Sequence, residues 1–352
     1  MQGNYRCRNE KTVMNNLNPW EYTELEFPGQ LAYLTVSCTT RCNFKCVFCS
    51  KKDHAVTDLD YGILKKALSE SLLLGLRKVE LTGGEALLYP HFWDVVAYLS
   101  ENDVMVQLVT NGSLIDRELA GKLAAARINV AISLTTLDPE EFSYLSGGQG
   151  EHRTVVETLE HLKASGYRAD NYPMFAIHSL GSRKNFNELD RLRTFAAQKG
   201  CGFVLNRAIP VGGLQADNVP STTDLKLFLN NESGDYPASV PFSGDTPCNR
   251  LKAGCYIGSD AKVRPCSSID IGVGDLCKES ITTIWRESEI LERCRTIDNH
   301  LEGSCGTCPE RSRCYGCRAA AYAAWGSLTA PDPGCFRFSE DAQFNSRQGG
   351  TE

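Results

Sequence analysis

Short apolar runs alternate with longer segments of helical periodicity up to about residue 210. In residues 58–75, for example, Leu64, Leu68 and Leu72 recur at the spacing of one helix face. The apolar runs between such segments have the length of buried strands. The pattern predicts strands at residues 31–37, 77–82, 104–110, 128–134, 173–179 and 202–207. It predicts helices at residues 58–75, 91–101, 115–126, 152–166 and 186–199.

Regular alternation of strands and helices is typical of a parallel sheet with right-handed crossovers. Six such units can form a doubly wound sheet or a partial barrel, and the periodicity is compatible with both. In barrels the chemistry sits at the C-terminal ends of the strands. Residues just after each predicted strand are therefore the first candidates for a functional site.

The pattern changes after residue 208. Residues 209–246 are rich in Pro, Gly, Asn, Ser and Asp, which predicts a connector with one short helix near 223–230. Residues 247–338 have few periodic segments, with one helix predicted near 280–296. A region with so little apolar core needs additional stabilising cross-links, and bound metal would supply them.

Composition and charge narrow the class of protein. The 352 residues are 42% hydrophobic and 23% charged, which is ordinary for a globular chain. The formal net charge of −6 lacks the basic surplus of nucleic-acid-binding proteins, so no nucleic-acid partner is expected. Residues 1–18 do not have the apolar core of a signal peptide, and no run is long enough to span a membrane. We therefore expect a cytoplasmic protein without a membrane partner.

The chain has sixteen cysteines, an unusual number. In the reducing cytoplasm, structural disulfides are not expected, so ligation of metal or iron–sulfur clusters explains the cysteines better. Four of them lie within residues 38–49 and ten within residues 248–335. This distribution predicts two separate cysteine sites.

The first site follows the first predicted strand, where Cys42, Cys46 and Cys49 are separated by three and two residues. Three thiolates on one short loop can bind three irons of a 4Fe–4S cluster and leave the fourth iron open for a cosubstrate. The same loop could also bind zinc, with Cys38 or His54 as the fourth ligand. The spacing alone is compatible with both metals.

Polar and glycine residues end the next three strands. Gly83 and Gly84 permit close approach of a ligand to the backbone, and the carboxylate of Glu85 can accept from an ammonium group. Asn111 ends the third strand and Ser133 ends the fourth. Taken singly, each of these is also ordinary turn chemistry.

In combination, the CxxxCxxC loop and the later Gly-Gly-Glu resemble the radical S-adenosylmethionine (SAM) superfamily. The resemblance implies a partial (β/α)6 barrel of the TIM type over residues 31–210. It implies that Cys42, Cys46 and Cys49 hold a 4Fe–4S cluster that binds SAM and cleaves it reductively to a 5′-deoxyadenosyl radical, which abstracts hydrogen from the substrate. The SAM contacts that it implies are Phe48, Gly83, Gly84, Glu85, Asn111 and Ser133.

The second site contains the spacing C-x2-C-x5-C-x2-C over residues 305–317, a strong metal signal that is also compatible with zinc. It resembles the SPASM domain, which carries two auxiliary 4Fe–4S clusters. Two departures are that Ala261 replaces a glycine of the family pattern, and that two rather than three residues separate Cys314 and Cys317. The resemblance implies one cluster on Cys248, Cys255, Cys266 and Cys317, and another on Cys305, Cys308, Cys314 and Cys335. The other cysteines, expected to be buried or half-buried small hydrophobic residues, are Cys7, Cys38, Cys201, Cys277 and Cys294.

The expected organisation joins the two sites in one chain. It consists of an N-terminal extension (1–30), the radical SAM barrel (31–210), a linker (211–246), a small Cys-rich α+β SPASM domain (247–340) and a disordered tail (341–352). A flavodoxin or ferredoxin-type protein is the expected electron donor. Two non-catalytic alternatives remain at this stage: a zinc-stabilised binding protein and a simple electron-transfer protein.

The substrate is predicted less directly. Only 41 residues precede Cys42, which does not suit an N-terminal peptide-recognition domain, so a small polar metabolite (sugar, aminosugar or nucleoside) of an antibiotic-type biosynthetic pathway is expected. A ribosomally synthesised peptide is the alternative. His178 could donate a proton to the substrate, and Arg207 could bind a carboxylate or phosphate. Equally, His178 could be an ordinary half-buried histidine and Arg207 part of a salt bridge. The net reaction, whether of an oxidoreductase, a lyase or an epimerase, stays open.

Overall fold

The expected parallel α/β architecture is present in the computed structural model, which describes residues 29–49, 55–169, 172–211, 219, 249–309, 311 and 314–335. Each of the six expected strands forms within about two residues of its predicted bounds. They are β1 (Tyr33–Thr39), β2 (Lys78–Gly83), β3 (Met105–Thr110), β4 (Asn129–Ser133), β5 (Phe175–Gly181) and β6 (Gly202–Arg207). Neighbours from β1 to β6 pair in parallel, as strand–helix alternation requires.

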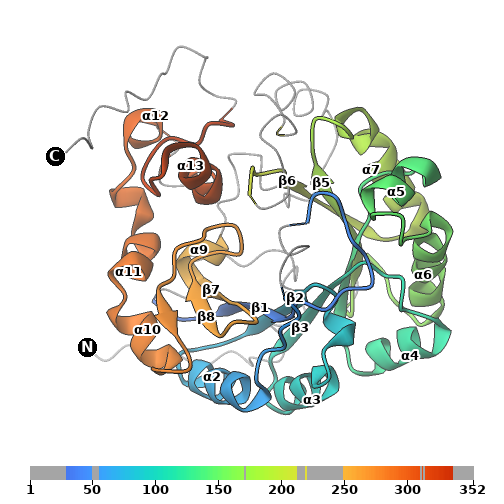
Figure 1. Cartoon of the computed structure of the whole chain (residues 1–352), viewed down its shortest axis with the longest axis horizontal. Helices are drawn as coiled ribbons and strands as arrows, with labels where there is room; N and C mark the ends of the chain where they lie inside the picture. Colours follow the sequence, from blue (N-terminus) through green and yellow to red (C-terminus); the bar gives the residue numbers. More distant parts are fainter. Residues whose placement is uncertain are drawn as a thin grey trace, which may run out of the picture.

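Helices cover the outer side of the curved sheet, which gives a partial barrel (Figure 1). Asp60, Asp116 and Asp138 each begin a helix by accepting a hydrogen bond from the backbone N–H three residues later. The helices are α2 (Tyr61–Leu73), α3 (Phe92–Glu101), α4 (Arg117–Ala125), α5 (Pro139–Leu145), α6 (His152–Ala164) and α7 (Leu189–Lys199). Short 3-10 turns are η2 (Ala86–Leu88) and η3 (Phe186–Glu188).

The outer face of the sheet is apolar because it packs against these helices. Val79 and Leu81 of β2, like Val106 and Leu108 of β3, are buried in the larger hydrophobic core. Side chains alternate between the two faces of a strand, so the residues between these four point to the inner face of the barrel. Several of those residues are polar, and the barrel interior is therefore suited to polar contacts.

A ladder of polar side chains crosses the inner face. Thr35, Glu80 and Gln107 lie opposite one another on β1, β2 and β3, and all three are buried. The carboxylate of Glu80 accepts from the Thr35 hydroxyl at 3.5 Å and from Nε2 of Gln107 at 2.9 Å. A buried polar group left without a partner costs about 1–3 kcal/mol. The ladder therefore favours the register that places the ends of these three strands side by side.

The C-terminal region joins the barrel sheet directly, which the sequence did not predict. Strand β7 (Gly254–Ile257) pairs in parallel with β1, and the antiparallel strands β8 (Lys262–Arg264) and β9 (Gly274–Asp275) follow it. The described strands thus form one sheet in the order β6-β5-β4-β3-β2-β1-β7-β8-β9. The helices of this region are α9 (Asn249–Ala253), α10 (Ile281–Glu287), α11 (Glu289–Arg295), α12 (Gly303–Gly306) and α13 (Arg318–Trp325), with the 3-10 turn η5 (Ile297–Asn299).

One predicted helix is divided in the structure, and several short helices, among them α5, α9, α12 and α13, were not predicted. The single helix expected near 280–296 is divided into α10 and α11, because Ser288 has an extended backbone (ψ 114°) and its side chain caps α11 by accepting from the N–H of Leu291. Helix α5 was not predicted, although Asp138 followed by proline is a helix-start signal. The helix expected near 223–230 and the tail from residue 341 lie outside the described residues.

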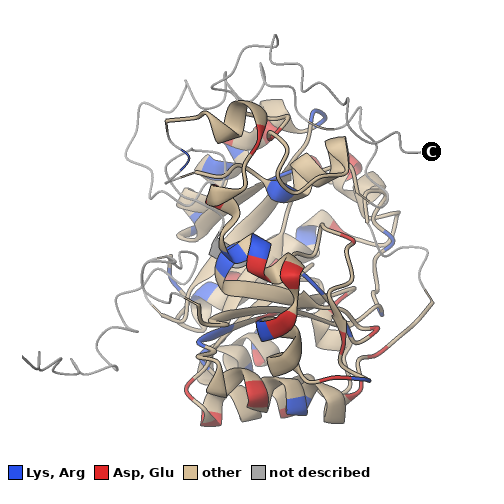
Figure 2. Cartoon of the chain, turned by 90° about the vertical axis from the view of Figure 1, so that its left-hand side faces the viewer, with Lys and Arg blue, Asp and Glu red and all other residues tan. Residues whose placement is uncertain are grey.

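Charged residues of both signs are interspersed on the side of the chain that Figure 2 shows. Among the helices that the structure describes, none is both long and apolar enough to cross a bilayer.

Candidate active site

The first cysteine loop begins at a fixed point at the end of β1. Asp58 accepts a hydrogen bond from the Thr39 hydroxyl at 2.6 Å and forms an ion pair with Arg41 at 2.9 Å. The backbone N–H of Thr40 donates to the carbonyl of Thr57 at 2.9 Å. Cys42 follows directly, so the position of the first cysteine is set by these contacts.

The residues after β3 hold the next part of the loop. The side-chain amide of Asn111 donates to Oδ1 of Asn43 at 2.9 Å, and the amide of Asn43 donates to the Ser113 hydroxyl at 2.8 Å. The same Asn111 amide lies 4.0 Å from the sulfur of Cys42. Asn111, expected to contact SAM, therefore also supports the cysteine loop.

The far part of the loop rests on helix α5. The N–H of Lys45 donates to the carbonyl of Ser146 at 3.1 Å, and the ring of Phe44 meets that of Phe142 edge-on at 6.3 Å. Gly147 has a φ of 73°, and a Cβ there would lie 2.2 Å from the carbonyl oxygen of Lys45. A larger residue would therefore displace the loop from the helix.

Gly83 and Gly84 let a second loop pass against the base of the cysteine loop. A Cβ on Gly83 would lie 2.3 Å from the carbonyl oxygen of Thr39, and one on Gly84 would lie 2.2 Å from that of Arg41. Because no side chain intervenes, the backbones of the two loops form hydrogen bonds. The N–H of Gly84 donates to the carbonyl of Thr39 at 2.8 Å, and the N–H of Glu85 donates to the carbonyl of Arg41 at 2.7 Å. The two glycines thus have a packing role in addition to the expected contact with SAM.

Glu85 is fully buried and joins the ends of β2 and β3. Its carboxylate accepts from the hydroxyl of Thr110 at 2.9 Å and from the N–H groups of Asn111 and Leu87 at 2.9 and 3.2 Å. Burial raises the pKa of this carboxyl group, and the three hydrogen bonds oppose that rise. The contact of Glu85 with the amino group of SAM stays a prediction.

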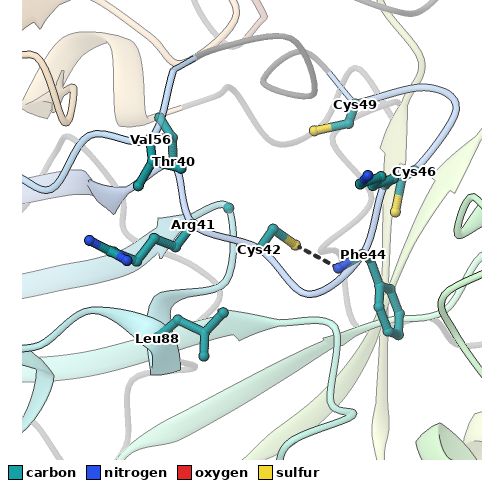
Figure 3. Close-up of a pocket in the computed structure, with 10 residues that line it drawn as sticks. Thr40, Arg41, Cys42, Phe44, Cys46, Cys49, Val56 and Leu88 are labelled. Atoms are coloured by element: carbon teal, nitrogen blue, oxygen red, sulfur yellow. Dashed lines mark hydrogen bonds between the residues drawn. The ribbon is translucent and has the colours of Figure 1, made fainter.

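The three cysteines line one cavity of about 530 Å³, which also reaches Gly84 and Leu88. Figure 3 shows them along one curved loop, with the sulfur atoms of Cys42 and Cys49 directed toward the space that the loop encloses. Burial raises the pKa of Cys42, and burial together with the negative charges of Cys49 and Cys42 raises that of Cys46 to about 12. Thiolates here are costly unless a cationic partner compensates them, which the irons of a cluster would do.

A zinc site in this loop would need a fourth ligand. Of its two possible fourth ligands, His54 lies outside the described residues, and Cys38 is fully buried and donates to the carbonyl of Thr82 at 3.2 Å. In a 4Fe–4S cluster each of the three thiolates would bind a different iron of one compact unit, which leaves the fourth iron open.

The other expected contacts lie on the loop and on the inner face. Phe48 is half-buried between Cys46 and Cys49. Ser133 at the end of β4 is paired in register with His178 of β5. The ring of His178 is hydrogen-bonded through Nε2 to the side-chain amide of Asn206 on β6. Ser133, His178 and Asn206 therefore form a polar group on three neighbouring strands.

Arg207 differs from its expected role as a substrate contact. Its guanidinium is 8% exposed and pairs at 2.7 Å with Asp332, which is 7% exposed. Although burial alone would raise the pKa of Asp332, the charge of Arg207 and the N–H of Cys317 hold it below its ordinary value. Arg207 is thus committed to a buried ion pair within the protein.

The cysteines expected to hold the second auxiliary cluster lie around Asp332. Its N–H lies 3.5 Å from the sulfur of Cys305, and its carbonyl accepts from the N–H of Cys335 at 3.1 Å. Burial raises the pKa of Cys314, and the nearby charges of Cys305 and Cys308 raise it further. These four cysteines thus lie in one region of the fold, and their assignment to one cluster stays a prediction.

The described cysteines of the group expected for the first auxiliary cluster pack against two different cores. Cys255 is 3% exposed in β7, opposite Leu34 of β1, and packs in the larger core. Cys266 and Cys317 instead pack against the smaller core, which contains Cys294. The pairing of β7 with β1 buries Cys255 opposite Leu34, and the assignment of these cysteines to one cluster stays a prediction. Cys248 lies outside the described residues.

The remaining cysteines mostly have the expected structural role. Cys38, Cys201 and Cys294 are buried, whereas Cys277 is exposed, contrary to expectation. Cys7 lies outside the described residues.

Sequence reasoning did not identify Asp58 or Asp332, which fix the two cysteine regions. Asp332 lies in the segment Asp-Pro-Gly-Cys, and a charged residue close to an expected ligand was the signal available.

Comparisons with known proteins agree with this geometry. Residues 36–190 match the model of the radical SAM superfamily, and residues 248–309 match that of SPASM, an iron–sulfur cluster-binding domain. The first match contains the cysteine loop and the Gly-Gly-Glu segment. The second begins at Cys248 and ends after Cys308. Together with the SAM-bound structural relatives of this fold, these matches identify SAM and 4Fe–4S clusters as the cofactors of an enzyme.

Relatives match most of the chain. An AdoMet-dependent heme synthase of Methanosarcina barkeri is 26% identical over 337 residues, covering 84% of this chain and 94% of the relative. The mycofactocin maturase MftC of Mycobacterium tuberculosis is 27% identical over 330 residues, covering 86% and 82%. The structure of Streptococcus suis SuiB bound to the precursor peptide SuiA has the same fold, with a TM-score of 0.68 and 16% identity over 88% of this chain and 76% of SuiB. The chain therefore belongs to the radical SAM superfamily and carries a C-terminal SPASM iron–sulfur domain.

Proposed function

We propose that this radical SAM enzyme is a maturase that modifies a peptide. The observation that carries the catalytic part is the loop of Cys42, Cys46 and Cys49, which is anchored at three places and opens on one cavity beside Gly84. Bound there, SAM and the cluster would supply a 5′-deoxyadenosyl radical that can remove hydrogen from carbon.

The peptide part is supported by the relatives. A maturase matches 86% of this chain, and SuiB, which shares the fold, binds a precursor peptide. The relatives that match more than four-fifths of this chain are named for heme and mycofactocin, so they do not support the small polar metabolite expected from the short N-terminal segment. Since a likeness in fold does not fix a substrate, the peptide remains a proposal.

The chain's own residues would position both reactants. Asp58, Asn43 and helix α5 hold the cysteine loop in place, and the apolar side chains of Phe44 and Leu88 limit water in the cavity. His178, oriented by Asn206, is the proposed substrate contact on the inner face. A histidine held in this way can hydrogen-bond a polar group of the substrate.

The cluster assignment is tested by replacing Cys42, Cys46 and Cys49 together with alanine. We expect the anaerobically reconstituted variant to lose 5′-deoxyadenosine formation and to retain about eight of about twelve irons, since only one of three clusters is removed. Iron analysis and chromatography of the SAM products measure both. The matched control is Cys277→Ala, because Cys277 is exposed and outside every expected ligand group. Continued 5′-deoxyadenosine formation by the triple variant would contradict the assignment.

The substrate is tested separately with the wild-type enzyme. Short peptides encoded beside its gene are incubated with enzyme, SAM and dithionite, and their masses are measured. We expect one peptide to change mass as 5′-deoxyadenosine accumulates. His178→Gln should lower the rate of peptide modification more than it lowers the rate of SAM cleavage measured without peptide.

A heme precursor is the second candidate, because the heme synthase matches over 94% of its own length. The same assay with a tetrapyrrole in place of the peptide distinguishes the two. Turnover of the tetrapyrrole alone would replace the peptide proposal and leave the radical SAM assignment unchanged.

A further inference from the structure

A buried ion pair connects the last barrel strand to the C-terminal cysteines. Arg207 is the final residue of β6, and its Nη2 lies 2.7 Å from Oδ1 of Asp332, 125 positions away in the chain. Both side chains are less than a tenth exposed. A pair this deeply buried is not needed for solubility, and its desolvation has to be compensated by specific contacts.

Asp332 makes those contacts with three cysteines. Its Oδ2 accepts from the N–H of Cys317 at 2.7 Å. Its backbone N–H donates toward the sulfur of Cys305 at 3.5 Å, and its carbonyl accepts from the N–H of Cys335 at 3.1 Å. One aspartate therefore contacts cysteines from both expected auxiliary groups.

Arg207 is also close to this group: burial would lower its pKa, but the charges of Asp332 and Cys317 raise it. The surrounding backbone leaves space for the pair: a Cβ on Gly334 would lie 2.0 Å from Nη1 of Arg207, and one on Gly316 would lie 2.7 Å from Cβ of Asp332. A second buried guanidinium, that of Arg318, lies 3.9 Å from the sulfur of Cys305.

Hydrogen bonds to cysteine sulfur and the local net charge are two of the factors that set the reduction potential of an iron–sulfur cluster. A charge acts more strongly in a buried site, where water screens it less. We propose that the Arg207–Asp332 pair is a positioning element that sets the reduction potentials of the auxiliary clusters held by Cys317 and Cys305. The inference rests on the SPASM assignment and is independent of the peptide substrate.

The test uses the full-length, reconstituted protein and changes one charge at a time. Arg207→Gln leaves the carboxylate uncompensated, so we expect the midpoint potential of an auxiliary cluster to fall. Asp332→Asn leaves the guanidinium uncompensated, so we expect that potential to rise. Potentials are measured by redox titration followed by electron paramagnetic resonance, and iron is counted for each variant.

Because the two substitutions are expected to shift the midpoint potential in opposite directions, they distinguish an effect of charge from a general loosening of the fold. Arg207→Lys keeps the charge, so its potential should lie closer to wild type than that of Arg207→Gln. The matched control is Arg153→Gln, which breaks an exposed ion pair with Glu157 on α6 and should leave the potentials unchanged. If Arg207→Gln fails to load iron, Asp332→Asn and Arg207→Lys carry the same test.

Two results would overturn the proposal. One is an unchanged auxiliary potential in variants with full iron content. The other is a shift in the same direction for Arg207→Gln and Asp332→Asn. Failure of the SPASM assignment itself is recognised differently, because the wild-type protein would then lack the auxiliary iron altogether.

Discussion

Single residues of the site's motifs have packing roles that their expected chemistry does not indicate. Gly83 and Gly84 allow two loops to share backbone hydrogen bonds, and Glu85 satisfies three donors around them. The spacing of Cys42, Cys46 and Cys49 predicted the loop, because that information is local. The roles of Asp58 and Asp332 could not be predicted, because their partners are brought to them only by the fold.

Gly84→Ala should damage the first cluster specifically. The new Cβ would meet the carbonyl oxygen of Arg41, whose neighbour Cys42 begins the ligand loop. We expect a loss of about 1–3 kcal/mol in the free energy of unfolding. We also expect a loss of up to about four of about twelve irons. Denaturant unfolding and iron analysis measure the two effects.

Gly121→Ala is the matched control for that change. Gly121 lies in α4 with nothing within 4 Å of its would-be Cβ, so alanine should leave iron content unchanged and stabilise the helix slightly. Equal iron loss in both variants would show that the contact with Arg41 is not the cause.

Whole elements were predicted with uneven success, for a physical reason. The six barrel strands and their helices carry strong periodicity, and their bounds were found to within a few residues. Strand β7 has only four residues and its partner β1 lies far away in the chain, so no local pattern indicates their pairing. The burial of Cys255 in the larger core could not be predicted either, because the face of a strand depends on the sheet that it joins.

Cys255→Ala tests that placement of β7. Since Cys255 is buried in the larger core, we expect full iron content and a loss of about 1 kcal/mol in stability, near the value for removing one buried methyl-sized group. Cys305→Ala, by comparison, should lower the iron content by about four, one cluster. If Cys255→Ala lost as much iron as Cys305→Ala, Cys255 would be a cluster ligand.

At the scale of the whole molecule, the barrel and part of the C-terminal region share one sheet and the larger core. Ile257, Ile281 and Trp285 belong to the same core as the barrel residues. The indole N–H of Trp285 also donates to the carbonyl of Gly29 at 3.3 Å, and the N–H of Ile281 donates to Glu70 at 3.0 Å. The sequence predicted two regions from their different compositions, and the composition carries no information on how closely they pack.

A chain ending at residue 211 should therefore not fold as an independent barrel. Its strand β1 would become an open edge, and the core would lose the side chains that α10 and β7 supply. We expect the truncated protein to aggregate, and the full chain to unfold in one transition by circular dichroism. A soluble truncated protein with native helical content would contradict this expectation.

The pairing of β1 with β7 also has a consequence for biosynthesis. The ribosome makes β1 early and β7 only after the whole barrel sequence has been translated. The sheet that carries the first cysteine loop is therefore incomplete for most of synthesis, and the residues around Asp332 emerge later still. Iron and sulfide should then be delivered to a finished chain rather than to an emerging one, and all clusters would be loaded within the same late interval.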